Sequence, residues 1–447
     1  MARTNVKSVS RETTHEGGRA VPGLTPLQQL QRTVLACFLW ENNFYEDGVS
    51  VADRIYTSAE ACKPEDVAGL AVTARAIHNL RHVPLLLLRV LARTGAGKPG
   101  LVSGAIENVI RRADELAEFL ALYQKDRRQP LSAQVKKGLA KAFQRFDEYA
   151  LAKYNRDGAY KLRDVLFLCH AKPKSDAQAA LWKRLIDGEL ATPDTWEVGL
   201  SKGGDKKETF ERLLREDQLG YLALLRNLRN MVEAGCDREL IKGAILARKG
   251  ANRVLPFRYV AAARAAPSLE PSIDIALQAA IAELPVLQGH TCVLVDVSGS
   301  MDDKLSAKSD MRRIDAAAAL GAIINAPNLT LATFSNQLAI LPPRKGMSGV
   351  DAIVKSQPHG GTYLAGALQT LNDLVVRNND PLERLIVISD EQAHDNIGIM
   401  PVVKHKYLIN VATHKNGVGY RGGWLHCDGF SEGVLRYIHA MEAEGFA

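Results

Sequence analysis

The chain has 447 residues, of which 46% are hydrophobic and 24% are charged, a composition typical of soluble globular proteins with room for two or three domains. The N-terminal stretch MARTNVKSVS lacks the apolar segment of a signal peptide, and Arg89 interrupts the richest apolar run well short of a membrane span, so we expect a cytoplasmic protein that does not enter a membrane. Six cysteines without a C-x-x-C pair argue against a disulfide framework or a zinc knuckle.

The net charge of +7 is unevenly distributed along the chain. Residues 1–290 contain 43 Lys and Arg against 34 Asp and Glu, whereas residues 291–447 contain 14 against 16. A basic surface for an anionic partner is therefore expected in the first part.

Up to about Leu284 the pattern predicts one helix after another. Thr25 and Pro26 form a start signal, a capping hydroxyl followed by proline in the first turn. Apolar residues recur at helical spacing in further segments separated by short Gly, Pro or charged breaks: Val67–His78, Pro84–Arg93, Ala113–Tyr123, Val135–Tyr154, Ala177–Ile186, Leu219–Glu233 and Pro271–Leu284. So many consecutive helices favour a stacked solenoid of helix pairs, with an irregular all-α bundle as the alternative.

After Pro285 the pattern changes to alternating strands and helices. Thr291–Val297, TCVLVDV, is an apolar run of β-forming residues, as expected for a strand buried on both faces. The predicted elements that follow are a helix at Ile314–Asn325, strands at Leu329–Phe334 and Leu338–Leu341, a helix near Leu364–Val376, strands at Leu385–Ser389 and Tyr407–Thr413, and a helix at Gly433–Glu444. This order predicts an open, mainly parallel α/β sheet that binds ligands beyond the carboxyl ends of its strands.

Oxygen-bearing side chains gather where these strands end. Asp296, Ser298 and Ser300 follow the first strand in the motif D-V-S-G-S-M, Thr362 follows a glycine pair, and Asp390 ends the strand LIVIS. Such hard oxygen ligands suit a divalent cation, with Mg²⁺ favoured, rather than zinc. The alternatives are that Asp and Ser only shape turns, or that a serine is a nucleophile, which the lack of a G-x-S-x-G motif and of a placed histidine disfavours.

The motif D-V-S-G-S-M, with Thr362 and Asp390 downstream, resembles the metal-ion-dependent adhesion site of von Willebrand factor A domains. The resemblance covers residues 285–447. It implies that Ser298, Ser300 and Thr362 are direct or near-direct ligands and that Asp296 and Asp390 act mostly through water.

A basic belt lies between Ala121 and Lys174, with 13 Lys and Arg against 5 Asp and Glu. On the predicted helix Val135–Tyr154, four cations lie away from the apolar face: Lys136, Lys137, Lys141 and Arg145. The cations and histidine that follow include Lys153, Arg156, His170, Lys172 and Lys174. Clustered cations predict contact with phosphates, with a solvated helix face as the alternative. Phe143 and Phe146 are assigned to the core rather than to base stacking.

Four segments of the helical part resemble the TROVE module of the Ro autoantigen family: Thr25–Gly48, His78–Leu88, Asp164–Pro173 and Leu222–Met231. That family joins a helical module to a von Willebrand A-type domain in the same order. The resemblance implies a ring of HEAT-like repeats, small structured Y-type RNAs on its outer surface, and single-stranded ends of misfolded RNA in a basic central hole. It makes Lys153, Arg156 and His170 candidate outer contacts, and the candidates for the hole are Arg75, Arg81, His82 and Arg89.

These observations together predict a polar tail at residues 1–16, a TROVE module at 17–284 and an A-type domain at 285–447. We expect a non-enzymatic RNA-binding protein acting in small-RNA stability or RNA quality control, with an exoribonuclease or another protein with an acidic surface as a further candidate partner. The alternative is a protein-interaction scaffold whose A-type domain grips an acidic partner through its metal.

Overall fold

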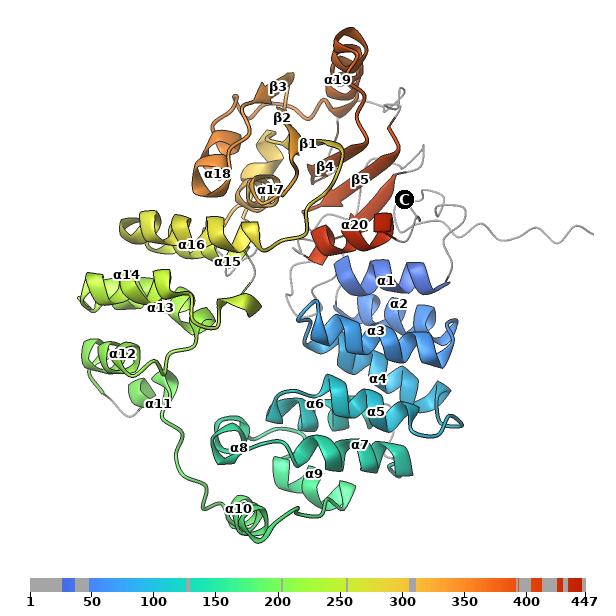
Figure 1. The fold of residues 1–447 in the computed structure, drawn as a ribbon, viewed down its shortest axis with the longest axis vertical. Helices are drawn as coiled ribbons and strands as arrows, with labels where there is room; N and C mark the ends of the chain where they lie inside the picture. The colour runs from blue at the N-terminus through green and yellow to red at the C-terminus, as the bar shows by residue number, and fades with distance from the viewer. Residues whose placement is uncertain are drawn as a thin grey trace, which may run out of the picture. The chain divides into compact units, whose positions relative to one another are not determined.

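The computed structural model of the chain describes residues 26–36, 48–125, 129–201, 204–254, 256–304, 311–390, 393, 403–411, 424–428 and 433–443. They form two compact units, one built from helices α1–α14 and the other from the elements that follow Val254 (Figure 1). Among these residues, no helix has the length and apolar character needed to cross a bilayer. The predicted tail at 1–16, Thr413 at the end of a predicted strand and Glu444 at the end of the last predicted helix lie outside the described residues.

The described residues of the first unit form helices joined by loops and turns. Its elements are α1 (Pro26–Ala36), α2 (Gly48–Glu60), α3 (Pro64–Ala76), α4 (His82–Thr94), α5 (Leu101–Val109), α6 (Ala113–Tyr123), α7 (Ala133–Phe143), α8 (Glu148–Tyr154), α9 (Leu162–Cys169), α10 (Asp176–Asp187), α11 (Trp196–Ser201), α12 (Lys206–Arg215), α13 (Tyr221–Glu233), α14 (Arg238–Ala247) and the 3₁₀ turn η1 (Ala251–Arg253).

Short polar side chains start several of these helices. Each accepts a hydrogen bond from a backbone N–H in the first turn: Ser132, Asp147, Ser175, Asp205 and Asp237. Such caps satisfy backbone donors that have no partner inside the helix. The cap at Asp147 also corrects a prediction, because the single helix expected at Val135–Tyr154 is two helices, α7 and α8, with a break between them.

The helices stack in two layers. Helices α1, α3, α5, α7 and α9 pack in succession on one another, and α2, α4, α6 and α8 form the second succession beside them. Helices α11–α14 pack among themselves in the same unit. This arrangement of helix pairs (Figure 1) confirms the predicted solenoid and excludes the irregular bundle.

Large apolar side chains pack between the helices. Phe143 is fully buried and meets Trp182 edge-on, with ring centroids 5.4 Å apart, while Phe146 is 8% exposed. The assignment of both phenylalanines to the core is therefore confirmed.

The second unit begins with helices and continues as an α/β sheet. Its elements are α15 (Phe257–Ala265), η2 (Pro267–Leu269), α16 (Glu270–Ala282), β1 (His290–Asp296), η3 (Gly299–Asp302), α17 (Arg313–Ala322), β2 (Asn328–Phe334), β3 (Leu338–Leu341), α18 (Gly346–Val354), α19 (Leu364–Asn378), β4 (Arg384–Ser389), β5 (His405–Asn410), β6 (Leu425–Asp428) and α20 (Gly433–Ala443).

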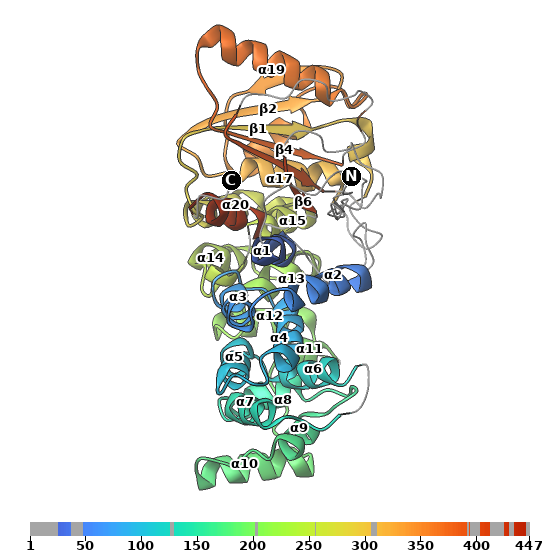
Figure 2. The ribbon, with the colours of Figure 1, turned by 90° about the vertical axis from the view of Figure 1, so that its right-hand side faces the viewer.

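The six strands found among the described residues form one sheet in the order β3-β2-β1-β4-β5-β6. Only β3 runs antiparallel to its neighbour, and the other pairs are parallel. Helix α19 covers one face and α17 covers the other (Figure 2). Strands β1 and β4 are buried along nearly their whole length, so the prediction of central strands buried on both faces is confirmed.

Helices α15 and α16 belong to the same compact unit as the sheet, where they contact α17 and α18. Arg264 of α15 pairs with Asp351 of α18 at 2.7 Å, and the backbone N–H of Met347 donates to Asp274 Oδ1 of α16 at 2.7 Å. The packing thus divides the chain at Val254, whereas the predicted boundary at residue 285 marks the change of sequence pattern. That boundary stays a prediction.

Candidate metal centre and nucleic-acid interface

Two buried carboxylates meet at the carboxyl edge of the sheet. Asp296 ends β1, and Asp390 follows the last residue of β4. The two strands are parallel neighbours, with Val295 level with Ile388. Both carboxylates are 0% exposed, so the topology brings together two acids that lie far apart in the sequence.

The loops at this edge are joined to one another. The backbone N–H of Ser298 donates to Asp296 Oδ1 at 2.9 Å, and the Ser298 and Ser300 hydroxyl oxygens lie 3.3 Å apart. The Gly299 N–H donates to the Gly360 carbonyl at 2.9 Å, which links the turn after β1 to the loop that carries Thr362. Thr362 is 2% exposed. The structure therefore places all five predicted metal residues at one edge of the sheet.

The charge of Asp296 is poorly compensated. Its other carboxylate oxygen accepts a hydrogen bond from Ser389 Oγ at 2.6 Å, but within the described part of the chain it forms no ion pair with a basic side chain. Burial, together with the neighbouring Asp390 carboxylate, raises the pKa of Asp296 to about 7. A buried carboxylate without a cationic partner is costly, so a cation at this edge is electrostatically favoured.

The available donors suit a hard cation. No group of three or more His, Cys, Asp or Glu side chains that could hold a metal occurs among the described residues. The five predicted residues supply instead two carboxylates and three hydroxyls, all hard oxygen donors, which is the donor chemistry that Mg²⁺ accepts together with retained waters. The residues present thus fit the predicted ion.

A basic side chain that the sequence pattern did not indicate lies against this edge. Arg313, at the start of α17, has a side chain that is 6% exposed. Its Nη1 donates to the Ser300 carbonyl at 3.1 Å and lies 3.3 Å from Asp390 Oδ2, and its Nη2 lies 3.4 Å from Asp303 Oδ2. Arg312 and Arg313 directly precede the alanine-rich apolar run of α17, and two adjacent arginines at the start of a buried helix are the only sequence signal.

A histidine braces the same turn from the outside. His359 Nδ1 lies 2.8 Å from Asp302 Oδ2, and its Nε2 lies 2.9 Å from the Val354 carbonyl. Burial acts against the charged ring, but these two partners outweigh it and raise the pKa of His359. The turn after β1 is therefore held by an arginine on its buried side and a histidine on its outer side.

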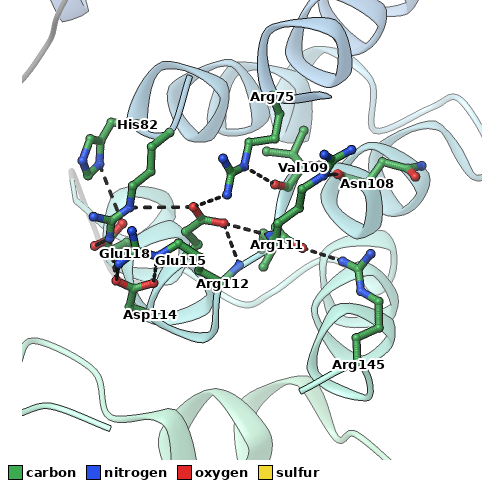
Figure 3. Close-up of polar contacts among 12 residues, drawn as sticks. Arg75, His82, Asn108, Val109, Arg111, Arg112, Asp114, Glu115, Glu118 and Arg145 are labelled. Carbon is green, nitrogen blue, oxygen red and sulfur yellow. Dashed lines mark hydrogen bonds and ion pairs between the residues drawn. The ribbon is translucent and has the colours of Figure 1, made fainter. Parts of the chain in front are cut away.

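The cations proposed for a central hole are largely paired with acids (Figure 3). Arg75 Nη2 contacts Glu115 Oε1 at 2.7 Å and its Nε donates to the Val109 carbonyl at 3.1 Å. Arg81 contacts Asp114 at 2.6 Å and also pairs with Glu118. These contacts join α3 and α4 to α6 and neutralise the guanidinium groups, so Arg75 and Arg81 have a structural role here.

The other two candidates for the hole are similarly engaged. His82 Nδ1 lies 3.7 Å from Glu118, and burial with the nearby Arg81 and Arg112 lowers the pKa of His82 to about 4. Arg89 is 5% exposed, donates to the Tyr56 hydroxyl and lies 4.6 Å from the centre of that ring. The burial of Arg89 contradicts its prediction as a phosphate contact. The His82 side chain is 28% exposed, and its role stays a prediction.

Part of the predicted belt on α7 is also tied to a neighbouring helix. Lys141 Nζ lies 2.9 Å from Glu107 of α5. Arg145 donates to the carbonyls of Glu107 and Ile110 at the end of α5, and burial is the main cause that lowers its pKa. Arg145 thus satisfies helix-end carbonyls, although the residue is exposed, and its contact with phosphate stays a prediction.

The remaining cations of the belt are accessible. Lys137, Arg156, His170, Lys172 and Lys174 are exposed, and Lys136 is half-buried. Within the described residues, none of the lysines and arginines of this set forms an ion pair. His170 ends α9 in the left-handed conformation, with φ of 53°, which turns the chain into the exposed loop that carries Lys172 and Lys174.

Tyrosine rings lie beside two other cations of the helical unit, Lys153 and Arg112, and the sequence pattern did not indicate these rings. Lys153 Nζ lies 5.5 Å from the centre of the Tyr149 ring and 5.8 Å from that of Tyr154. The guanidinium of Arg112 lies 4.6 Å from the centre of the Tyr154 ring. Tyr149 and Phe167 are 48% and 56% exposed. Exposed aromatic rings are suited to stacking on unpaired bases.

A stack of helix pairs, followed in the chain by an open sheet with a D-x-S-x-S turn at its carboxyl edge, defines a helical-repeat protein with a von Willebrand A-type domain. Two regions match known families accordingly. Residues 175–273 match the TROVE domain, and residues 291–392 match the von Willebrand factor type A domain. The chain therefore carries a TROVE domain followed by a von Willebrand factor type A domain, in the order that the predicted resemblance implies.

Individual proteins show the same relationship. A 90-residue segment, 19% of this chain, is 32% identical to telomerase protein component 1 of Mus musculus, and it spans 3% of that relative's length. The crystal structure of the Deinococcus radiodurans RO (RSR) protein is similar over 95% of this chain and 100% of that chain, with a TM-score of 0.66 and 17% sequence identity. This likeness shows that the fold is shared.

Proposed function

We propose that this protein is a non-catalytic RNA-binding protein of the cytoplasm that binds small structured RNA through the accessible cations of its helical unit. The observation that carries the proposal is the contrast between two sets of cations. Lys137, Arg156 and Lys172 are exposed and form no ion pair within the described residues, whereas Arg75 and Arg81 are matched to carboxylates.

Unpaired exposed cations attract phosphates, because the phosphate backbone dominates the affinity for nucleic acid. Tyr149 and Phe167 add exposed rings, which suit the unstacked bases of loops and ends. The TROVE domain and the resemblance to the Ro autoantigen family support a Y-like small RNA and the ends of misfolded RNA as ligands, and a role in RNA stability or quality control.

The test compares two triple variants with the same change of charge. Replacing Lys137, Arg156 and Lys172 with glutamine should weaken binding of a stem-loop RNA and flatten the plot of log K against log salt by about 0.7–0.9 per lost phosphate contact. The matched control replaces three exposed lysines that already have carboxylate partners, Lys183, Lys242 and Lys249. Equal effects of the two variants would mean that only net charge matters and that the assigned surface is wrong.

We also propose that the edge formed by Asp296, Ser298, Ser300, Thr362 and Asp390 holds a divalent cation, with Mg²⁺ favoured. The donor set and the uncompensated Asp296 support this, and the family resemblance implies direct or near-direct coordination by the hydroxyls. Asp296→Ala and Thr362→Ala should each remove the rise in melting temperature that Mg²⁺ produces. Ser348→Ala, a change in an exposed hydroxyl of α18, is the control and should leave that rise intact.

A second candidate function is a scaffold that grips an acidic protein, such as an exoribonuclease, through the metal. It is favoured by Tyr363, which directly follows Thr362 and is 44% exposed. A protein bound in this way should be released by EDTA and by Thr362→Ala. RNA bound to the helical unit should be retained in both cases, provided that the RNA stays folded.

A further inference from the structure

Arg313 lies at the edge of the sheet that carries the proposed metal site, hereafter the metal edge, and its positive charge affects the binding of a metal ion there. Its guanidinium is buried beside two carboxylates, one of which, Asp390, belongs to the proposed metal site. The same Nη1 atom holds the Ser300 carbonyl at 3.1 Å. A single buried cation therefore contacts the acid that follows β4 and the backbone of the turn that follows β1.

These contacts have a structural consequence. Because Arg313 fixes the Ser300 backbone, it also fixes the turn that brings the Ser300 hydroxyl within 3.3 Å of the Ser298 hydroxyl. The turn is additionally tied to α17 by the Arg313 N–H, which donates to the Asp303 carbonyl at 2.9 Å. The arrangement of the donors thus depends on a side chain that is part of the fold.

The contacts also have an electrostatic consequence. The guanidinium compensates Asp390, whereas no basic side chain among the described residues pairs with Asp296. A divalent cation entering this edge would be attracted by Asp296 and Asp390 but repelled by a fixed positive charge that contacts one of them. Arg313 therefore opposes the binding of a divalent cation at the same edge whose oxygen donors it positions.

We propose that Arg313 is a built-in positioning cation of the metal edge: it keeps the edge assembled when no metal is bound, and it weakens the affinity for divalent cations. This inference rests on the proposed metal function of the edge. When the affinity of the metal edge for a divalent cation is low, occupation of the site depends on a further negatively charged ligand, such as a carboxylate of a partner protein.

A purely structural arginine gives different expectations. If Arg313 only supports the turn, its removal should disorder the donors and weaken metal binding. If it also opposes the metal, its removal should lower the stability of the metal-free protein and strengthen metal binding. The first case predicts weaker Mg²⁺ binding and the second predicts stronger Mg²⁺ binding, so a titration with Mg²⁺ distinguishes them.

The test uses the full chain and three variants. Arg313→Met removes the charge and keeps the length of the side chain, Arg313→Gln keeps amide donors for the Ser300 carbonyl, and Arg313→Lys keeps the charge. Arg377→Met, which removes an exposed cation of α19, is the control. Mg²⁺ binding is measured by isothermal titration calorimetry, and melting temperatures are measured in EDTA and in Mg²⁺.

Arg313→Met and Arg313→Gln should melt at a lower temperature than wild type in EDTA, and Mg²⁺ should raise their melting temperatures more than it raises that of wild type. Both variants should bind Mg²⁺ at least about tenfold more tightly than wild type, the scale expected for removing a nearby unit charge. Arg313→Lys and Arg377→Met should retain affinities near that of wild type. If Arg313→Met fails to fold, Arg313→Gln decides the matter by the same measurements.

Two outcomes overturn different statements. If wild type binds Mg²⁺ and both uncharged variants bind it equally or more weakly, the inference about Arg313 is wrong and the metal site stands. If neither wild type nor the uncharged variants bind Mg²⁺ in the calorimeter or respond to it in melting, the proposed metal function fails and the inference fails with it.

Discussion

Replacing Glu115 with alanine should destabilise the helical unit far more than the loss of an ordinary surface acid. Its side chain is 0% exposed and contacts the Arg75 guanidinium at 2.7 Å. It also accepts hydrogen bonds from the backbone N–H groups of Arg111 and Arg112 at 2.8 and 3.0 Å. Removing one partner of a buried pair costs about 3–5 kcal/mol, and we expect a loss in this range.

The loss is measured by urea unfolding followed by circular dichroism. Glu239→Ala is the control, because Glu239 is 81% exposed and its pair with Lys242 should contribute less than about 1 kcal/mol. The double variant Glu115→Ala with Arg75→Met should be less destabilised than the sum of the two single variants, since it leaves no unpaired buried charge. A loss of stability below about 1 kcal/mol for Glu115→Ala, or strictly additive losses in the double variant, would refute the inference that the pair of Arg75 and Glu115 stabilises the fold.

Three further predictions follow from contacts in the two units. Because the pKa of His82 is lowered to about 4, the unfolded chain binds a proton below about pH 6.5 that the folded chain does not. The free energy of unfolding should therefore fall as pH drops from about 6.5 to 4, by about 1–2 kcal/mol given the partial exposure of the ring, and His82→Gln should flatten this dependence. Gly138→Ala should destabilise the protein by about 1–3 kcal/mol, because its added Cβ would lie 2.7 Å from Ile106 Cβ at the α5–α7 contact; Gly243→Ala on α14, where nothing lies within 4 Å, is the control. EDTA should change the affinity for a stem-loop RNA less than a few-fold, and complete loss of binding by folded RNA would show that the metal bridges to phosphate.

The sheet domain was largely predictable because its signals are local. The run TCVLVDV and the strand LIVIS are apolar along their whole length, and both predicted strands are found, as β1 and β4. The carboxyl ends of neighbouring parallel strands meet at one edge, so their order alone brought Asp296 and Asp390 together. The strand β6 and the helix α18 were not predicted, and both are short.

The charged residues were less predictable, because the partner of a cation is not visible in a local pattern. Arg75 and Lys141 resemble free cations in the sequence, yet their carboxylate partners lie 40 and 34 residues away. Arg313 was overlooked for the same reason, since Asp390 is 77 residues distant. Composition identified a basic region, and only the packing of helices shows which of its cations remain unpaired.

The spacing of these contacts has a consequence for how the chain folds. In the helical unit, side-chain bonds between helices join residues about one helix pair apart, such as Gln144 with Gln178 at a separation of 34. In the sheet, Arg384 bonds to Thr291 across 93 residues. Short loops close faster than long ones, and contacts that are near in sequence favour rapid folding. The helical unit can therefore form progressively during synthesis, whereas the central strands must wait until β4 has been made.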